Sequence, residues 1–305
     1  MSGQRTVRKP ASIVGVGLHS GKETSLTLRP APVNSGIVFR RTDLPDPVSI
    51  RVSPEKVTET MLATTLSQGN VKIGTIEHLM SALNGFGIDN VYVDVDGPEV
   101  PIMDGSGYDF VGLIDKAGLS DKPNADKWFV RILEPVEVKE EGKFARLEPY
   151  EGFALEFTID FDNPVIARSV QHAQVDLCFQ TYRQAVSYAR TFGFLKDAEL
   201  LKRMGLGRGG SLENAIIIDG DKVLNPEGLR ADDEFVKHKI LDAMGDLYVL
   251  GRPLLAKYVG YRSGHALNNS LIRMITEGKV RYELVKFGEG SRCRPRHYDE
   301  ERLIP

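Results

Sequence analysis

The chain has 305 residues, of which 41% are hydrophobic and 27% are charged, and its formal net charge is -3. This length predicts two domains or one large one, and the balanced charge argues against a nucleic-acid-binding surface. No apolar run approaches the roughly 18 residues that span a bilayer, and no secretory signal is recognisable, so we expect a cytoplasmic protein without a transmembrane segment. The only cysteines, Cys178 and Cys293, are too few for a disulfide framework or a thiolate metal site and favour a reducing compartment.

The first part of the chain predicts strands followed by helix, strand and helix. Alternating apolar residues indicate the strands, and glycines and prolines separate the elements. Thr75 precedes an apolar helix and is a plausible N-cap. The expected order is strands at 25–29 and 36–40, a less regular stretch at 48–75, a helix at 75–83, a strand at 90–95, a Gly/Pro-rich loop at 97–107 and a helix at 108–117.

The same order of elements recurs in the second part, where a helix at 233–246, a strand at 254–259 and a helix at about 267–276 follow several strands. We therefore predict an α+β fold with an internal duplication, built from two similar two-layer α/β sandwich domains. The boundary is expected in the polar, linker-like stretch 120–127. The predicted domains are 1–124, with an insert at about 48–75, and 125–305, with an insert at about 191–217.

The helix at 233–246 carries the first candidate site. His238, Asp242 and Asp246 lie four residues apart, opposite an apolar stripe that includes Ile240 and Met244. An imidazole and a carboxylate one helical turn apart can bind the same divalent metal. The alternative is that these side chains form the solvated face of an amphipathic helix.

The duplication places His78 and His238 on equivalent helices. If these helices face each other, His78, His238 and Asp242 can meet, and three N/O ligands with an open fourth position are typical of a catalytic zinc. Glu77 flanks this face and would serve as a general base, although Glu77 and His78 could also be a surface pair. Fe²⁺ would accept the same ligands.

Two further segments carry candidate catalytic residues. His265 follows a glycine at the start of a helix, so it is a helix cap, a surface residue or a protonated general acid held by Asp246. The Thr191 hydroxyl could stabilise an oxyanion, and Phe192 and Phe194 could line an apolar pocket. The alternative for this second segment is a buried strand.

The remaining polar candidates have weaker signals. Lys239 would be a poor core residue, which suggests an anionic substrate group beside it. His19 lies in a glycine-rich turn that lacks the Gly-Lys-Ser/Thr ending of a phosphate-binding loop, so we expect a structural role. His172 and His297 have no supporting context.

Several long motifs resemble the UDP-3-O-acyl-N-acetylglucosamine deacetylase family, the zinc enzymes of the committed step of lipid A synthesis in Gram-negative bacteria. The resemblance runs through nearly the whole chain, from Gly15-Val16-Gly17-Leu18-His19-Ser20-Gly21 to Lys286-Phe287. It is densest at Thr75-Ile76-Glu77-His78-Leu79, at residues 100–106, at Ala189-Arg190-Thr191-Phe192-Gly193-Phe194, at residues 233–243 and at residues 263–269.

The resemblance implies two βααβ-type domains with the active site between them. It implies one Zn²⁺ on His78, His238 and Asp242, which lowers the pKa of a water and polarises the acetamide carbonyl. The other implied roles are Glu77 as general base, His265 as general acid to the leaving amine with Asp246 behind it, and Thr191 as a partner of zinc at the oxyanion.

The resemblance also implies an acylated UDP-sugar as substrate, whose 2-acetamido group is hydrolysed to acetate and a free amine. The second insert would form an apolar passage for the 3-O-acyl chain, and its candidate lining is Phe192, Phe194, Leu18, Gly210, Ser211 and Ala215. Lys239 would meet the diphosphate, and the uridine diphosphate would lie at Lys143, Asp160, Phe161 and Arg262. A site made within one chain needs no partner subunit, so we expect a monomer.

Two departures from the family and two rival functions remain. Ala63 replaces a cysteine found in some members, and the tail 291–305 is charged where enteric members end in small apolar residues. Regulated proteolysis through the tail is therefore doubtful. The rivals are a zinc amidohydrolase for another acylated nucleotide sugar and a non-enzymatic scaffold with solvated His and Asp residues. The sequence does not fix the preferred acyl-chain length.

Overall fold

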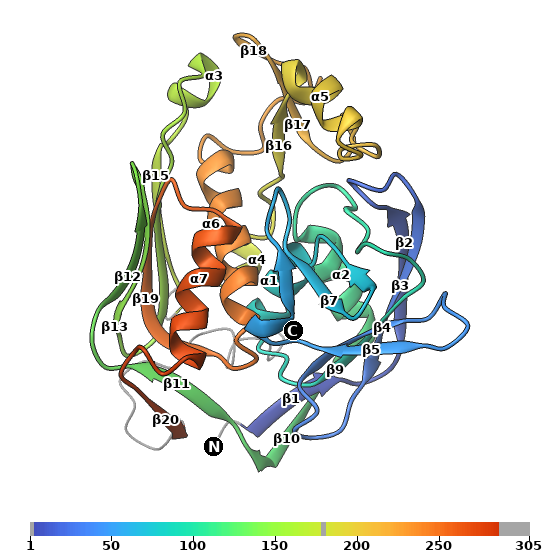
Figure 1. Cartoon of the computed structure of the whole chain (residues 1–305), viewed down its shortest axis with the longest axis vertical. Coiled ribbons are helices and arrows are strands. Elements are labelled where there is room, and N and C mark those ends of the chain that lie inside the picture. Colours follow the sequence, from blue (N-terminus) through green and yellow to red (C-terminus); the bar gives the residue numbers. More distant parts are fainter. Residues whose placement is uncertain (1–2, 178–180, 287–305) are drawn as a thin grey trace, which may run out of the picture.

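The computed structural model describes residues 3–177 and 181–286 (Figure 1). A five-stranded sheet forms the outer layer of the first half of the chain. Its strand order is β2 (Ala11–Val16), β3 (Glu23–Pro30), β9 (Val91–Val95), β4 (Ile37–Arg41) and β5 (Val48–Arg51). All neighbours are antiparallel except β9 and β4, which are parallel. Every second residue of β3, including Leu26 and Leu28, is buried, so the alternating sequence turns one face of the sheet to the core.

The second half of the chain contains a seven-stranded sheet with the same plan. Five of its strands follow the order β12 (Val136–Glu140), β13 (Lys143–Pro149), β19 (Leu254–Tyr261), β14 (Phe153–Thr158) and β15 (His172–Asp176). Among these five strands only one neighbouring pair, β19 and β14, is parallel, as in the first sheet. The two extra strands are β11 (Trp128–Ile132), which pairs with β19, and β20 (Tyr282–Lys286), which pairs with β11. We infer from this repeated strand order that the chain consists of two domains of one plan.

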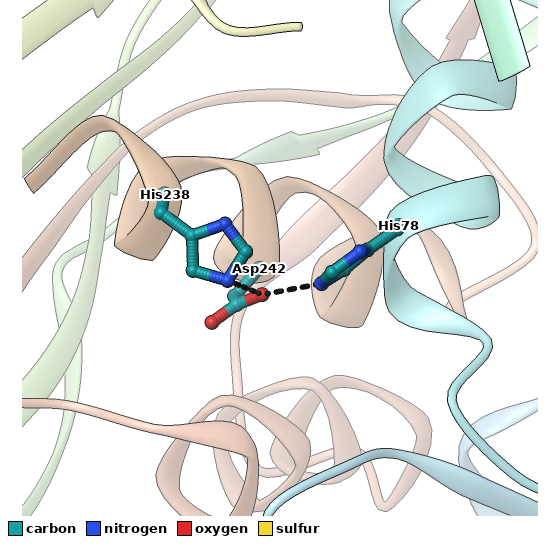
Figure 2. Close-up of side chains that lie close together, drawn as sticks. All are labelled: His78, His238 and Asp242. Carbon is teal, nitrogen blue, oxygen red and sulfur yellow. Dashed lines mark ion pairs between the residues drawn. The ribbon is translucent and has the colours of Figure 1, made fainter. Parts of the chain in front are cut away.

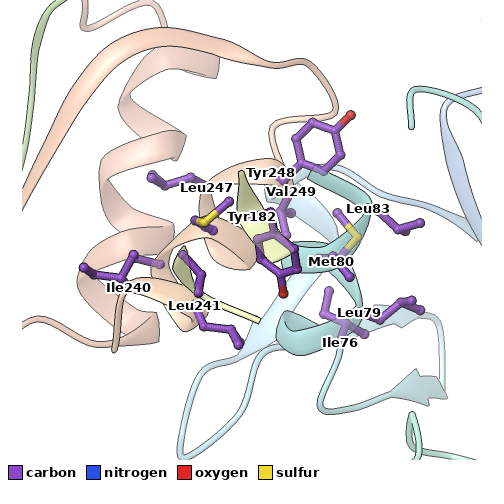
Figure 3. Close-up of a cluster of buried hydrophobic side chains, with 14 of the residues drawn as sticks. Ile76, Leu79, Met80, Leu83, Tyr182, Ile240, Leu241, Leu247, Tyr248 and Val249 are labelled. Atoms are coloured by element: carbon purple, nitrogen blue, oxygen red, sulfur yellow. The ribbon is translucent and has the colours of Figure 1, made fainter. Parts of the chain in front are cut away.

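Four helices lie between the two sheets (Figure 1). They are α1 (Glu77–Gly85) and α2 (Tyr108–Ala117) in the first half, and α6 (Glu234–Tyr248) and α7 (His265–Thr276) in the second. Helices α1 and α6 pack against each other through buried apolar side chains, shown in Figure 3. Leu79, Met80 and Leu83 of α1 and Leu241 and Leu247 of α6 belong to this shared core. The molecule is therefore mixed α and β, as the sequence predicted, and two helices from distant parts of the chain meet at its centre.

Each half carries a small additional sheet. The first is made of β6 (Val57–Glu59), β7 (Thr65–Gln68) and β8 (Val71–Ile73), and follows the 3-10 helix η1 (Pro54–Lys56). The second is made of β16 (Phe192–Phe194), β17 (Ile216–Asp219) and β18 (Lys222–Val223), with η2 (Leu195–Asp197) and α5 (Ala198–Arg203) between its first two strands. The bounds of these small sheets differ from those expected for the two inserts. In the first half, β5 pairs with β4 in the main sheet, so the small sheet begins only after β5. In the second half, the small sheet continues beyond residue 217 to β18.

Two local predictions were wrong. The polar stretch at 120–127 is largely a strand, β10 (Leu119–Asp126), because its main chain pairs with β1 (Gly3–Val7) at the N-terminus. Thr75 is not the N-cap of α1: Ile76 holds that position, and Thr75 has a positive φ of 56°. The Thr75 hydroxyl donates instead to the buried Glu99 at 2.7 Å.

Two short helices, α3 (Pro164–Ala167) and α4 (Tyr182–Ala185), complete the fold. Within residues 3–177 and 181–286, no helix combines the length and the apolar character needed to cross a bilayer. Cys178, Cys293, His297 and the charged tail at 291–305 lie outside the described residues.

Candidate metal centre and active site

Three buried side chains from the facing helices converge at one point (Figure 2). His78 comes from α1, and His238 and Asp242 come from α6; their ligand atoms all lie within 4.8 Å of one another. The Nε2 atoms of His78 and His238 lie 3.5 and 3.3 Å from Asp242 Oδ1. The cluster therefore has the composition and the spacing to hold one metal ion.

The surroundings of the cluster keep its donors in the protonation states that a metal needs. His238 Nδ1 lies 3.0 Å from the Ala189 carbonyl oxygen, which leaves Nε2 as the ligand atom. Burial lowers the pKa of His238 to about 3, so its ring is neutral. Burial alone would raise the pKa of Asp242, but His238 and Lys239 hold it well below its usual range. Lys239 Nζ donates to Asp242 Oδ2 at 2.5 Å.

The alternative of a solvated helix face is wrong for these residues. The relative exposure of His78, His238 and Asp242 is 4%, 2% and 4%, and that of Asp246 is 2%. Buried charged and polar groups need partners, and these residues find them in each other and in neighbouring groups such as the Ala189 carbonyl and the Lys239 ammonium. The His and Asp residues are thus part of an internal site, which removes the premise of the scaffold hypothesis.

Glu77 stands beside the cluster, one residue before His78. It is 3% exposed, and one of its carboxylate oxygens, Oε2, accepts a hydrogen bond of 3.0 Å from the Thr64 main-chain N–H. Burial raises its pKa, which moves a carboxylate toward the range of a general base. The buried position excludes the alternative of a surface pair.

Two groups of residues flank the cluster, and we call them the arms of the site. Glu77 is the first arm, and His265 and Asp246 form the second. His265 is the first residue of α7, after the N-cap Gly264, and its Nδ1 lies 2.8 Å from Asp246 Oδ2. Burial would lower the pKa of His265, but Asp246, together with Glu77 and Asp242, outweighs burial and raises this pKa to about 9. His265 is therefore a buried imidazolium at neutral pH, the state required of a proton donor.

Two polar residues that the sequence did not single out complete this arm. Thr64 Oγ1 donates to Asp246 Oδ1 at 2.6 Å, and Asn268 Nδ2 donates to Asp246 Oδ2 at 2.8 Å. Asn268 is held in turn by the hydroxyls of Tyr258 and Ser263, at 2.7 and 2.9 Å. The Asp246 carboxylate is thus held by three side chains, two from α7 and one, Thr64, from the segment before β7.

A cavity of about 320 Å³ is lined by the three side chains of the cluster and by Glu77 and His265. Thr191 and Phe192 reach it from the start of the second insert, and Leu18 reaches it from a turn after β2. Thr191 is anchored by its main chain, whose N–H donates to the Gly105 carbonyl at 2.7 Å. The side chains that line this cavity include Leu18, Glu77, His78, Lys143, Thr191, Phe192, His238, Lys239, Asp242 and His265.

A second cavity of about 370 Å³ adjoins the first, because Lys143 and Lys239 line both. Its lining also includes Asp160, Phe161 and Arg262. The Phe161 ring centroid lies 5.6 Å from that of Phe192, so an aromatic contact joins the walls of the two cavities. Three basic residues, Lys143, Lys239 and Arg262, and two acidic ones, Glu141 and Asp160, therefore surround a space next to the cluster.

Four of the expected substrate-binding residues do not line either of these cavities. Phe194 packs beside Phe161, with ring centroids 6.4 Å apart, and Ala215 is buried. Gly210 and Ser211 are exposed on the loop between α5 and β17. The second insert thus contributes Thr191 and Phe192 to the cavity, while residues 210–213 of its long loop are exposed.

The two other histidines with described surroundings lie outside the metal cluster. His19 Nδ1 accepts a hydrogen bond of 3.3 Å from the Gly207 N–H, and the His19 main chain donates to Glu99. His172 is exposed on β15, with Nδ1 3.0 Å from the Thr158 hydroxyl. These contacts connect neighbouring strands and loops of the protein, and neither histidine joins the cluster.

One protein-family model matches the chain over residues 4–277, and its description is UDP-3-O-acyl N-acetylglycosamine deacetylase. The matched range covers nearly the whole chain and contains the metal cluster, both arms and both cavities.

Proposed function

Since the chain belongs to the UDP-3-O-acyl N-acetylglycosamine deacetylase family, we propose that it hydrolyses the 2-acetamido group of UDP-3-O-acyl-N-acetylglucosamine. The products are acetate and UDP-3-O-acyl-glucosamine, and the reaction is the committed step of lipid A biosynthesis in a Gram-negative cell. We also propose that the enzyme is zinc-dependent and cytoplasmic. We propose a monomer, since one chain supplies all three proposed metal ligands.

One observation carries this proposal: the buried His78–His238–Asp242 cluster shares a cavity with Glu77 and with the charged His265. Two imidazole nitrogens and one carboxylate oxygen are the donor set of many catalytic zinc sites, and they leave a coordination position open. When bound there, zinc supplies Lewis acidity toward the acetamide carbonyl and makes a water acidic. Fe²⁺ fits the same donors.

The chain's own residues supply the proton transfers. Glu77 takes a proton from the attacking water, and His265 gives a proton to the amide nitrogen as the C–N bond breaks. Asp246 keeps the His265 ring oriented and charged through its 2.8 Å bond. Thr191 lines the same cavity, and its hydroxyl would donate to the oxyanion that forms on the carbonyl.

The adjoining cavity suits the nucleotide part of this substrate. Lys239, Lys143 and Arg262 offer positive charge for a diphosphate. Phe161 and Asp160 are available to the uridine. The acyl chain would leave the metal cluster along Leu18 and Phe192 toward Phe194 and Ala215, with Gly210 and Ser211 at the exposed end.

The test is deacetylation of UDP-3-O-acyl-N-acetylglucosamine by protein of measured metal content. We expect about one zinc per chain, loss of metal and activity in His78→Ala, and retained metal with a rate lower by about 10²–10⁴-fold in Glu77→Gln. Zinc binding without turnover of this substrate would redirect the assignment to another acylated nucleotide sugar. A protein that binds no metal would contradict the proposal altogether.

A further inference from the structure

We propose that Thr64 is a positioning residue that holds the general base and the general acid of the active site in one fixed arrangement. This inference rests on the proposed function, because it assigns those roles to Glu77 and His265. Thr64 belongs to the first insert, and it bonds to α1 through its main chain and to α6 through its side chain.

The main chain of Thr64 is bonded to the start of α1 on both sides. Its N–H donates to Glu77 Oε2 at 3.0 Å, and its carbonyl accepts from the Ile76 N–H at 3.3 Å. A carboxylate that is held at one oxygen cannot rotate freely about its last side-chain bond. Thr64 thereby fixes the plane in which Glu77 presents itself to the cavity.

The side chain of Thr64 acts on the other arm. Its hydroxyl donates at 2.6 Å to Asp246 Oδ1, while His265 and Asn268 both use Oδ2. Each carboxylate oxygen of Asp246 thus has a hydrogen-bond partner. Oδ2 is used by His265 and Asn268, and Oδ1 is held by Thr64. Because Thr64 is 2% exposed, water does not compete for this charge-assisted bond.

The local chain geometry explains why this residue is a threonine at the start of a strand. Leu62 has a positive φ of 61°, which turns the chain sharply before β7 begins at Thr65. Successive residues then point to opposite sides, so the Thr64 side chain faces Asp246 and the Thr65 hydroxyl faces Gly74. A β-branched side chain has few rotamers, and this keeps the Thr64 hydroxyl directed at its partner.

The decisive variant is Thr64→Val in the zinc-loaded full chain, because valine keeps the shape and the N–H but removes the hydroxyl. We expect kcat to fall by about 10- to 100-fold, as for other residues that orient catalytic groups, with KM and the zinc dissociation constant unchanged. Thr64→Ser restores the hydroxyl and should restore most of kcat. Thr65→Val is the matched control and should keep wild-type kcat.

Two further measurements separate positioning from general damage. In an Asp246→Ala background, which leaves the Thr64 hydroxyl without its carboxylate partner, Thr64→Val should change kcat no further, because either change alone already removes the same interaction. The proton on His265 Nδ1, observed by NMR in histidine-labelled protein, should shift in Thr64→Val and not in Thr65→Val.

Wild-type kcat in Thr64→Val, no recovery in Thr64→Ser, or a loss of zinc from Thr64→Val would each overturn the inference. An inactive wild-type protein would instead contradict the proposed function. In that case the His265 resonance still reports whether Thr64 orients the Asp246–His265 pair.

Discussion

Gly245 of α6 lies against the main chain of Glu77 in α1, so closely that a Cβ at position 245 would stand 2.0 Å from the Glu77 carbonyl oxygen. The two helices therefore touch backbone to backbone at this point. Glu77 precedes His78, and Gly245 follows Asp242 by three residues on the same helix. The absence of a side chain at Gly245 thus sets the distance across which His78 of α1 meets His238 and Asp242 of α6.

The substitution Gly245→Ala should force the helices apart. Overpacking a tight core costs about 1–3 kcal/mol, and a clash with main-chain atoms belongs at or above the upper end of that range. We expect a lower free energy of unfolding in denaturant titrations and weaker zinc binding in chelator competition. Gly112→Ala is the control: a Cβ there meets nothing within 4 Å, and alanine in helix α2 should stabilise the protein by about 0.5–1 kcal/mol. Equal stability of Gly245→Ala and wild type would contradict this account of the helix contact.

Removal of the metal should lower thermal stability, because the cluster forms only in the folded chain. A ligand at about 100 times its Kd stabilises the folded state by about 2.7 kcal/mol. Calorimetry of chelator-treated protein before and after zinc addition measures the effect. Asp242→Asn should lose most of the zinc-dependent increase in Tm, and an increase as large as that of wild type would place the ion elsewhere.

The rate of the reaction should depend on pH in two directions. His265 must be protonated to act as an acid, so kcat/KM should fall as the pH rises through the His265 pKa of about 9. Glu77 must be ionised to act as a base, so the rate should also fall as the pH drops through its raised pKa. A kcat/KM profile from pH 5 to pH 10 tests both limbs. In Asp246→Asn the alkaline limb should move to lower pH, since Asp246 is the main charge that raises the pKa of His265.

Arg190 should raise the zinc affinity of the site, although it is not one of the proposed ligands. Its Nε donates at 2.8 Å to Glu234 Oε1, and Glu234 is fully buried at the start of α6. This pair holds the segment in which the Ala189 carbonyl orients His238. Removing one partner of a buried ion pair costs about 3–5 kcal/mol, and losing an orienting group weakens metal binding by about 10- to 100-fold.

We therefore expect Arg190→Met to lower both the Tm and the zinc affinity. Arg203→Met provides the comparison, because its pair with Glu199 is almost fully exposed and should be worth less than about 1 kcal/mol. If the two variants bound zinc equally well, the Arg190–Glu234 pair would have no part in orienting His238.

The sequence predicted that His78, His238 and Asp242 converge because two regular signals coincided. Helical spacing placed His238 and Asp242 on one face, and the repeated order of elements pointed to His78 as their partner. Long amphipathic elements such as α2 and β19 were also found close to their observed bounds, since their apolar period reflects burial on one face.

The residues that orient the site could not be found in this way. Thr64 lies in an irregular stretch, and its partner Asp246 is 182 residues away in the sequence. Strand β10 escaped prediction for a related reason: its polar side chains carry no periodic signal, and it exists through main-chain pairing with β1. Contacts between distant polar groups depend on the three-dimensional packing, which residue spacing does not encode.

The equivalence that we propose for the two central helices has a consequence for how the proposed deacetylase behaves on dilution. His78 and His238 are each followed seven residues later by a glycine, Gly85 and Gly245, but Ala82 in α1 corresponds to Asp242 in α6. Two identical half-chains meeting on a twofold axis would present every group twice, and their site would come apart at low concentration. Covalent linkage lets each half keep its own side chains, so one chain holds the whole His78–His238–Asp242 cluster, and we expect the specific activity of the proposed deacetylase not to fall as the protein is diluted.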